Sequence, residues 1–223
     1  MIKKDIIRRA FTLAEVLLVV AIIGIVATFA VPNLNKNINE EKYILLLRTT
    51  FDKFEVAYNA VLSQYGSMAN AVNMDCVSGT TANNSTCLAA KIADKMDVTL
   101  NCGTSISKCF PGSSGYAFVL SNGVSIRFSS QAITSTTQVV VEFDLDGPNG
   151  PNEKGKDRFI IYLNHERNDN IEMRETDSVS EQVTPGSSFN ATFDKTPWAY
   201  YVGNMDYLRC PNDLKWGTKE TCD

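Results

Sequence analysis

The first strong pattern along the chain is an uninterrupted apolar run near its N-terminus. Residues 16–31 read VLLVVAIIGIVATFAV, and a segment that begins at Phe11 has about 20 residues, the length that a helix needs to cross a bilayer. Only Glu15 is charged within it, and a cluster of lysines and arginines precedes it. Because positive charge marks the cytoplasmic side of a membrane helix, we expect residues 1–10 in the cytoplasm and everything after Pro32 outside.

A second pattern follows a short polar stretch, NLNKNINEEK. Apolar residues recur there at steps of three and four, which predicts an amphipathic helix that ends near Gly66 and lies against a sheet. The recurring residues are Leu47, Phe51, Phe54, Tyr58, Val61, Leu62 and Tyr65. The two patterns together predict one long helix. Pro32 lies between them, and a proline at this place either kinks the helix or ends the membrane segment.

The rest of the chain alternates between turn-rich stretches and strand signals. A loop-rich region that includes a short helix at 88–95 is expected first, and an exposed polar excursion is expected at 164–194. Between them, apolar and β-branched runs predict an antiparallel sheet of about four strands. These runs are 115–120, 124–128, 139–144 and 158–163. The expected fold class is α+β, with the sheet covering the helix.

These patterns divide the chain into four parts. We expect a cytoplasmic segment at 1–10, a transmembrane helix at 11–32, an amphipathic continuation of the same helix at 33–66, and a globular head at 67–223.

All six cysteines lie outside the apolar run, in stretches rich in Gly, Ser, Thr and Asn. They are Cys76, Cys87, Cys102, Cys109, Cys210 and Cys222. An even number in such surroundings favours disulfides in an oxidising compartment, while the absence of a C-x-x-C pair and the single histidine, His165, count against zinc. Local pairs such as Cys76 with Cys87 and Cys102 with Cys109 would close short loops, but six cysteines allow fifteen pairings and the sequence leaves them open.

Charge and motifs narrow the function. A net charge of −4 and a pI near 5.1 argue against a nucleic-acid partner, which normally needs a basic face. The chain has no G-x-S-x-G, no histidine pair for a metal and no phosphate loop, and His165 is expected in a solvated loop. We therefore do not expect an enzyme or a catalytic residue.

One loop carries candidate metal chemistry. It follows the third predicted strand and places Asp144, Asp146 and Asn149 around glycines, with Asp157 before the next strand. Oxygen-bearing side chains at alternate positions can wrap a hard cation such as Ca²⁺, although the downstream glutamate of an EF-hand is missing. Turn chemistry alone also accounts for this composition, so a calcium site at Asp144, Asp146 and Asp157 and a purely structural loop both remain open.

The sequence around the start of the apolar run, RRAFTLAEV, resembles the processing site of type IV prepilins and of the pseudopilins of type II secretion systems. In that pattern a basic leader is cut just before Phe-Thr-Leu, one variable residue and Glu. Here Ala10 stands where the family nearly always has Gly. The resemblance implies cleavage between Ala10 and Phe11 by a prepilin peptidase and N-methylation of Phe11.

The same resemblance gives Glu15 a role. A carboxylate in a membrane helix costs about 2–3 kcal/mol or more, so it is by default a functional candidate. In the family this Glu pairs with the freed N-terminal amine, here that of Phe11, and the pairing brings subunits into register in the filament. The alternative is that Glu15 reaches the lipid headgroups.

The resemblance further implies a structural subunit of a type IV pilus or of a type II secretion pseudopilus. Its partners would be copies of itself and related pilins, the prepilin peptidase, the inner-membrane assembly machinery and the membrane. It would be held in the inner membrane with its head outside before it enters a filament at the cell surface. A minor pilin or adhesin-type binding module, and a tethered domain that never polymerises, are the alternatives.

The resemblance also extends to the head. The loop at 144–157 is similar to a pseudopilin head loop that in some members binds calcium. A bond between Cys210 and Cys222 would resemble the disulfide-bounded C-terminal region of many pilins.

Overall fold

The structure is a computed structural model that describes residues 13–68, 71, 84–133, 138–150, 152–164, 168–173 and 185–222. Four residues of interest from the sequence lie outside these ranges: Cys76, His165 and the processing-site pair Ala10 and Phe11. The chain divides into two units, Met1–Asn39 and Glu40–Asp223, and each is described by itself.

Helix α1 runs from Leu13 to Tyr65 and contributes to both units. The predicted end near Gly66 is confirmed: Gly66 has φ 85°, the left-handed conformation in which a glycine terminates a helix without a steric penalty, and its N–H donates to Leu62 O at 2.6 Å. The helix does not end at Pro32, which lies within its bounds.

In the first unit, the described apolar side chains of α1 are exposed. Leu13 is 80 % exposed, and Leu18 and Ile25 are each more than half exposed. Across the described parts of the chain, no helix is both long enough and apolar enough to cross a membrane. The membrane segment expected at 11–32 and the four-part division of the chain remain predictions.

The second unit is an α+β head with a six-stranded antiparallel sheet in the order β1-β2-β3-β4-β5-β6. Its strands are β1 Val98–Gly103, β2 Tyr116–Leu120, β3 Ser125–Phe128, β4 Gln138–Asp144, β5 Arg158–Asn164 and β6 Asn170–Met173. The four central strands lie where the sequence predicted them, but the expected total of about four was wrong. Both additional strands are edge strands, formed by pairing with a neighbour rather than by their own pattern.

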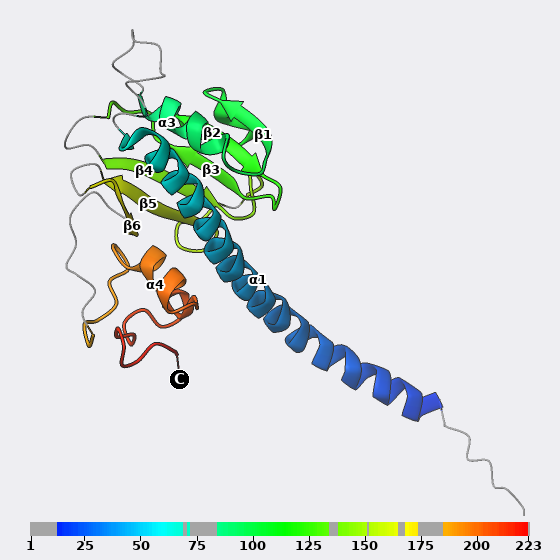
Figure 1. Cartoon of the computed structure of the whole chain (residues 1–223). Coiled ribbons are helices and arrows are strands. Elements are labelled where there is room, and N and C mark those ends of the chain that lie inside the picture. The colour runs from blue at the N-terminus through cyan, green and yellow to red at the C-terminus, as the bar shows by residue number, and fades with distance from the viewer. Residues whose placement is uncertain are drawn as a thin grey trace, which may run out of the picture. The chain divides into compact units, whose positions relative to one another are not determined.

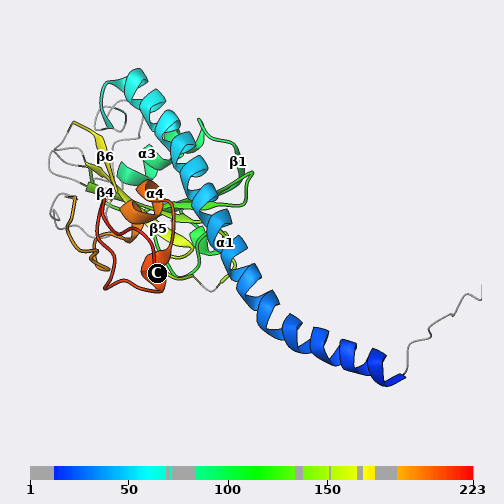
Figure 2. The ribbon, with the colours of Figure 1, turned by 90° about the horizontal axis from the view of Figure 1, so that it is seen from below.

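The second half of α1 covers one face of this sheet (Figures 1 and 2). Leu47, Phe51, Phe54, Tyr58 and Val61 are buried, each at most 5 % exposed, so the predicted amphipathic stripe is confirmed. They pack with apolar residues of the central strands in one core. Phe54 is at its centre, with ring contacts to Phe128 and Phe143 at 6.0 and 5.4 Å between centroids.

Shorter helices complete the head. The helix expected at 88–95 is present as α3, Asn84–Ala93, and packs on the β1–β3 end of the sheet. Helix α4, Lys195–Tyr201, contacts β5, and the 3-10 turns η1 and η2 cover Ile106–Lys108 and Asp206–Leu208. The expected exposed excursion at 164–194 is interrupted by β6, which joins the sheet.

Disulfides close two loops of the head. Cys102 bonds to Cys109 and Cys210 bonds to Cys222, with sequence separations of 7 and 12 residues. Cys87 is also disulfide-bonded. The preference for disulfides over a zinc site is therefore confirmed for the cysteines that the structure describes.

A candidate metal site between β4 and β5

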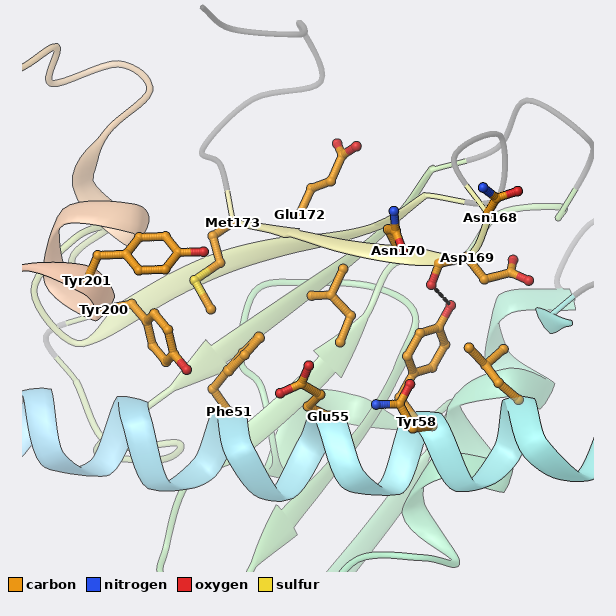
Figure 3. Close-up of a pocket in the computed structure, with 13 residues that line it drawn as sticks. Phe51, Glu55, Tyr58, Asn168, Asp169, Asn170, Glu172, Met173, Tyr200 and Tyr201 are labelled. Carbon is orange, nitrogen blue, oxygen red and sulfur yellow. Dashed lines mark hydrogen bonds between the residues drawn. The ribbon is translucent and has the colours of Figure 1, made fainter. Parts of the chain in front are cut away.

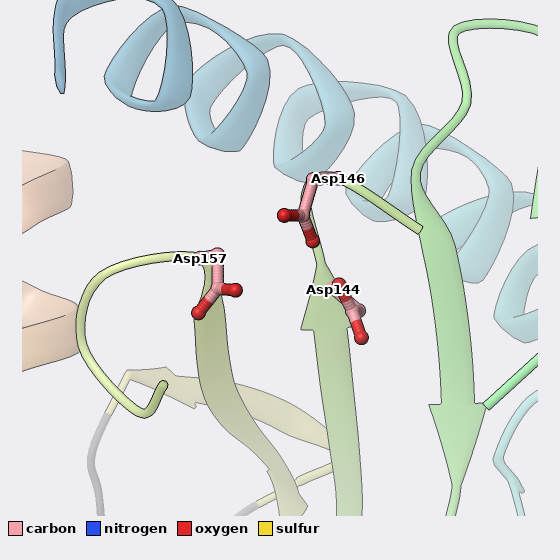
Figure 4. A group of neighbouring side chains, drawn as sticks. All are labelled: Asp144, Asp146 and Asp157. Atoms are coloured by element: carbon pink, nitrogen blue, oxygen red, sulfur yellow. The ribbon is translucent and has the colours of Figure 1, made fainter. Parts of the chain in front are cut away.

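The loop between β4 and β5 brings the three predicted aspartates together (Figure 4). Asp144 ends β4 and lies opposite Arg158, the first residue of β5, so the strand register fixes one end of the site. Leu145 N donates to Asp157 O at 2.8 Å and closes the loop on itself. One carboxylate oxygen from each of Asp144, Asp146 and Asp157 lies within 4.8 Å of the others.

Glycine makes this close turn feasible. Gly147 has φ 74°, and a Cβ there would lie 2.8 Å from the carbonyl oxygen of Gly123, which is too close. The sequence therefore needs glycine at this position for the chain to reverse beside β3.

Neighbouring elements hold the loop in place from outside. Tyr43 on α1 donates its hydroxyl to Asp146 Oδ2 at 3.5 Å, and Tyr207 in η2 donates to Gly155 O at 2.6 Å. Inside the loop, Glu153 N donates to Asp157 Oδ1 at 2.6 Å. The three carboxylates thus sit on a backbone anchored to α1 and to the C-terminal region.

Arg158 is the described cation that pairs with this cluster. Its Nε donates to Asp144 Oδ2 at 2.9 Å, while its guanidinium lies 4.2 Å from the centre of the Phe110 ring. Two carboxylate oxygens, Asp144 Oδ1 and Asp146 Oδ1, are buried with no hydrogen-bond partner among the described residues. Buried carboxylate oxygens usually accept hydrogen bonds or bind a cation, so this pair needs an explanation.

The crowding of acids also changes their protonation. Burial raises the pKa of Asp144 to about 7, and the hydrogen bond and charge of Asp146 add to this rise, while Arg158 opposes it. Burial likewise raises the pKa of Asp157, against the lowering effect of the Glu153 N–H. The cluster therefore holds more negative charge than its surroundings stabilise, and a bound cation or a proton would relieve it.

The spacing suits a calcium ion. Two oxygens bound to one Ca²⁺ at about 2.4 Å can be no more than about 4.8 Å apart, and one oxygen from each of the three carboxylates meets this condition. Ser125 lies opposite Asp144 in the β3–β4 register, and its hydroxyl too has no partner among the described residues. Sequence reasoning missed Ser125, Tyr43 and Arg158, because only the folded sheet and helix bring them to this loop.

Three predicted site residues, Ala10, Phe11 and Glu15, belong to the N-terminal motif. The structure describes only Glu15 of these three. It lies in the first described turn of α1, and its side chain is exposed.

Comparison with known proteins adds one finding. A family model for the prokaryotic N-terminal methylation motif matches residues 7–31, a span that includes Ala10, Phe11 and Glu15. This motif is the signature of type IV pilins and pseudopilins. No curated protein and no solved structure matches the chain.

Proposed function

We propose that this chain, which carries the N-terminal methylation motif at residues 7–31, is a structural subunit of an extracytoplasmic filament, either a type IV pilus or a type II secretion pseudopilus. The motif is the observation that carries the proposal. It supports a pilin-like or pseudopilin-like subunit that is not an enzyme. In this proposal the protein is anchored in the inner membrane by residues 11–32 and then extracted into a filament at the cell surface.

The processing step follows from the residues at the start of the motif. A prepilin peptidase cleaves between Ala10 and Phe11, and the new amine of Phe11 is methylated. Glu15 then pairs with the Phe11 amine of a neighbouring subunit. In the low-dielectric interior of a filament such an ion pair is strongly favoured over either charge alone, so it selects for processed subunits in register.

The exposed apolar side chains of the first unit support this proposal. Leu13, Leu17 and Ile23 are 80 %, 62 % and 61 % exposed. A continuous apolar surface of this kind marks a membrane or protein interaction site. Lipid covers it before assembly, and neighbouring helices cover it in the filament.

The test is mass spectrometry of the intact protein and its N-terminal peptide from cells with and without their prepilin peptidase. A chain that begins at methylated Phe11 only when the peptidase is present supports the proposal, with Ala10 accepted in place of Gly. A chain that still begins at Met1, or that begins after Ala30, would leave an unprocessed anchor or a secreted domain instead.

We also propose that Asp144, Asp146 and Asp157 bind a calcium ion in the head. Two buried oxygens, Asp144 Oδ1 and Asp146 Oδ1, have no hydrogen-bond partner among the described residues, and this supports the proposal. Three carboxylates paired with one described guanidinium, that of Arg158, leave a negative excess that a divalent cation would offset.

Calcium binding is tested by thermal unfolding of the full chain in mild detergent, with calcium or with EDTA. Binding to the folded state alone stabilises by about 2.7 kcal/mol at a calcium concentration 100 times Kd. Asp146→Asn should abolish the calcium-dependent shift, while Asp213→Asn, at an exposed carboxylate away from the loop, should keep it. Equal melting temperatures in calcium and EDTA would show that the loop is purely structural.

A further inference from the structure

A groove in the head lies between the second half of α1, the edge strand β6 and helix α4 (Figure 3). Its volume is about 590 Å³, within the range of binding sites for small ligands. The residues that line the groove include Phe51, Glu55, Tyr58, Met173, Tyr200 and Tyr201. All of them belong to the second unit.

At one end of the groove three aromatic rings, those of Phe51, Tyr200 and Tyr201, form an aromatic corner. The ring centroids of Phe51 and Tyr200 are 4.9 Å apart, those of Tyr200 and Tyr201 are 5.2 Å apart, and both pairs meet edge to face. Tyr201 is 64 % exposed, so much of its ring contacts solvent. Exposed aromatic faces set at steep angles to one another attract a cationic group, because the face of each ring carries partial negative charge.

The corner is held in a fixed position. Arg48 on α1 donates from Nε to Tyr200 O at 2.8 Å and from Nη2 to Tyr201 O at 3.3 Å. The Tyr200 hydroxyl donates to Asp52 Oδ1 at 3.3 Å. Arg48 thus fixes the end of α4 to α1 and is already engaged by backbone carbonyls. A rigid site of this kind loses little entropy when it binds a ligand.

The charge of the groove has one sign. Its described lining contains the carboxylates of Glu55, Asp169 and Glu172 and no lysine or arginine. Glu55 lies one helical turn after Phe51, and its carboxylate points from α1 toward β6 (Figure 3). It is exposed and makes no ion pair with the described residues. Burial raises the pKa of Tyr200, and the negative charges of Asp52 and Glu55 raise it further. The phenol of Tyr200 therefore stays neutral beside these acids.

We propose that this groove binds a lysine side chain presented by a segment of a partner protein. The ammonium group lies against the carboxylate of Glu55, and the aliphatic stem lies across Tyr200 and Tyr201, whose rings are backed by the buried Phe51. The aromatic walls match such a stem but offer no ligands to a metal ion, and the carboxylates repel an acidic segment. This site goes beyond the filament role, because it assigns the head a partner chemistry that polymerisation through α1 does not require.

The probe is a fluorescently labelled hexapeptide that alternates lysine and valine, added to the dispersed full chain in mild detergent. Fluorescence anisotropy measures its binding. The same peptide with acetylated lysines keeps the stem and loses the charge, and it should bind at least about tenfold more weakly, a change of about 1.4 kcal/mol. Raising the salt concentration should weaken the binding of the lysine peptide but not that of the acetylated peptide.

Two variants locate the site. Glu55→Gln and Tyr201→Ala should each lower the affinity for the lysine peptide by about five- to tenfold. Glu41→Gln is the matched control, since it removes an exposed carboxylate from the same helix outside the groove. Both altered groove residues are exposed, so the fold should be kept, and the fluorescence of the buried Trp198 and Trp216 verifies this.

Several results would overturn the proposal. The first is that the acetylated peptide binds as tightly as the unmodified peptide. The second is that Glu55→Gln and Glu41→Gln change the affinity for the lysine peptide equally. The third is that free lysine amide competes as strongly as the unlabelled peptide, which would indicate a site for small amines. The assay uses dispersed subunits, so its outcome does not depend on whether the chain polymerises.

Discussion

Helix α1 places apolar side chains in two opposite environments. Leu13 and Leu17 near its start are 80 % and 62 % exposed, whereas Leu47 and Phe54 in the head are at most 2 % exposed. The head supplies a sheet to cover the second set. The described side chains of the first set stay exposed, and their cover in a membrane or a filament is part of the proposed function.

The two regions also differ in how their roles are identified. The role proposed for the N-terminal region rests on the methylation motif at residues 7–31. A short motif can specify anchoring and assembly because these depend on a few residues in a fixed order. The candidate sites of the head come from distances and burial in the structure.

The largest expected contrast comes from truncating one side chain in each region. Phe54→Ala should lower the free energy of unfolding of the head by about 3–5 kcal/mol, because it leaves a cavity in the centre of the core. Leu17→Ala should change it by less than about 0.5 kcal/mol. Both tryptophans lie in the head, so denaturant unfolding followed by their fluorescence reports on that unit alone. A loss of about 2 kcal/mol or more in Leu17→Ala would contradict this division.

The sequence predicted the parts of this fold that have strong periodicity of their own. The stripe from Leu47 to Val61 and the four central strands alternate or recur clearly, and the structure confirms them. Strand β1 was missed because Asn101 and Gly103 are poor strand formers and its pairing with β2 is irregular. Strand β6 has only four residues and is formed by pairing with β5.

The candidate sites show the same limit. Asp144, Asp146 and Asp157 are close in sequence, so turn chemistry could predict their convergence. The groove joins Glu55, Met173 and Tyr201 from three distant elements, and no local pattern reports that they meet. A run such as Trp-Ala-Tyr-Tyr does not reveal by itself that Trp198 is buried while Tyr201 is exposed.

A smaller effect is expected from the disulfides, which act on the head alone. Replacing both Cys210 and Cys222 with alanine should cost about 3 kcal/mol, and replacing Cys102 and Cys109 slightly less, because the shorter loop restricts the unfolded chain less. Neither double variant should change recovery of the protein in the membrane fraction. Loss of membrane recovery in a variant with a folded head would show that the two regions are coupled.

A further effect concerns pH and depends on one residue, Asp144. In EDTA, stability of the head should fall as pH rises from about 4 to about 7, by at most about 1.4 kcal/mol per pH unit. The folded-state pKa of Asp144 is about 7 against an ordinary value of 3.8, so in this window the folded state holds a proton that the unfolded state has released. Asp144→Asn should flatten the profile, and Glu15→Gln should leave it unchanged. If the stability of the head instead rises between about pH 4 and pH 7, the raised pKa of Asp144 and its cause, burial, would be contradicted.

The central claim is that the N-terminal motif makes this chain a filament subunit, and Glu15→Gln tests it most directly. The measurement compares the amount of protein in filaments sheared from cells, or held in a pseudopilus fraction, for the wild-type chain and the variant. The N-terminal peptide is analysed in both. We predict that the Glu15→Gln variant still begins at methylated Phe11 and remains in the membrane. Its amount in filaments should be at least about tenfold lower than that of the wild-type chain. The control variant Glu41→Gln should assemble like the wild-type chain. Equal recovery of wild-type chain and Glu15→Gln in filaments would contradict the pairing of Glu15 with the Phe11 amine. Absence of both from every filament fraction would contradict polymerisation itself.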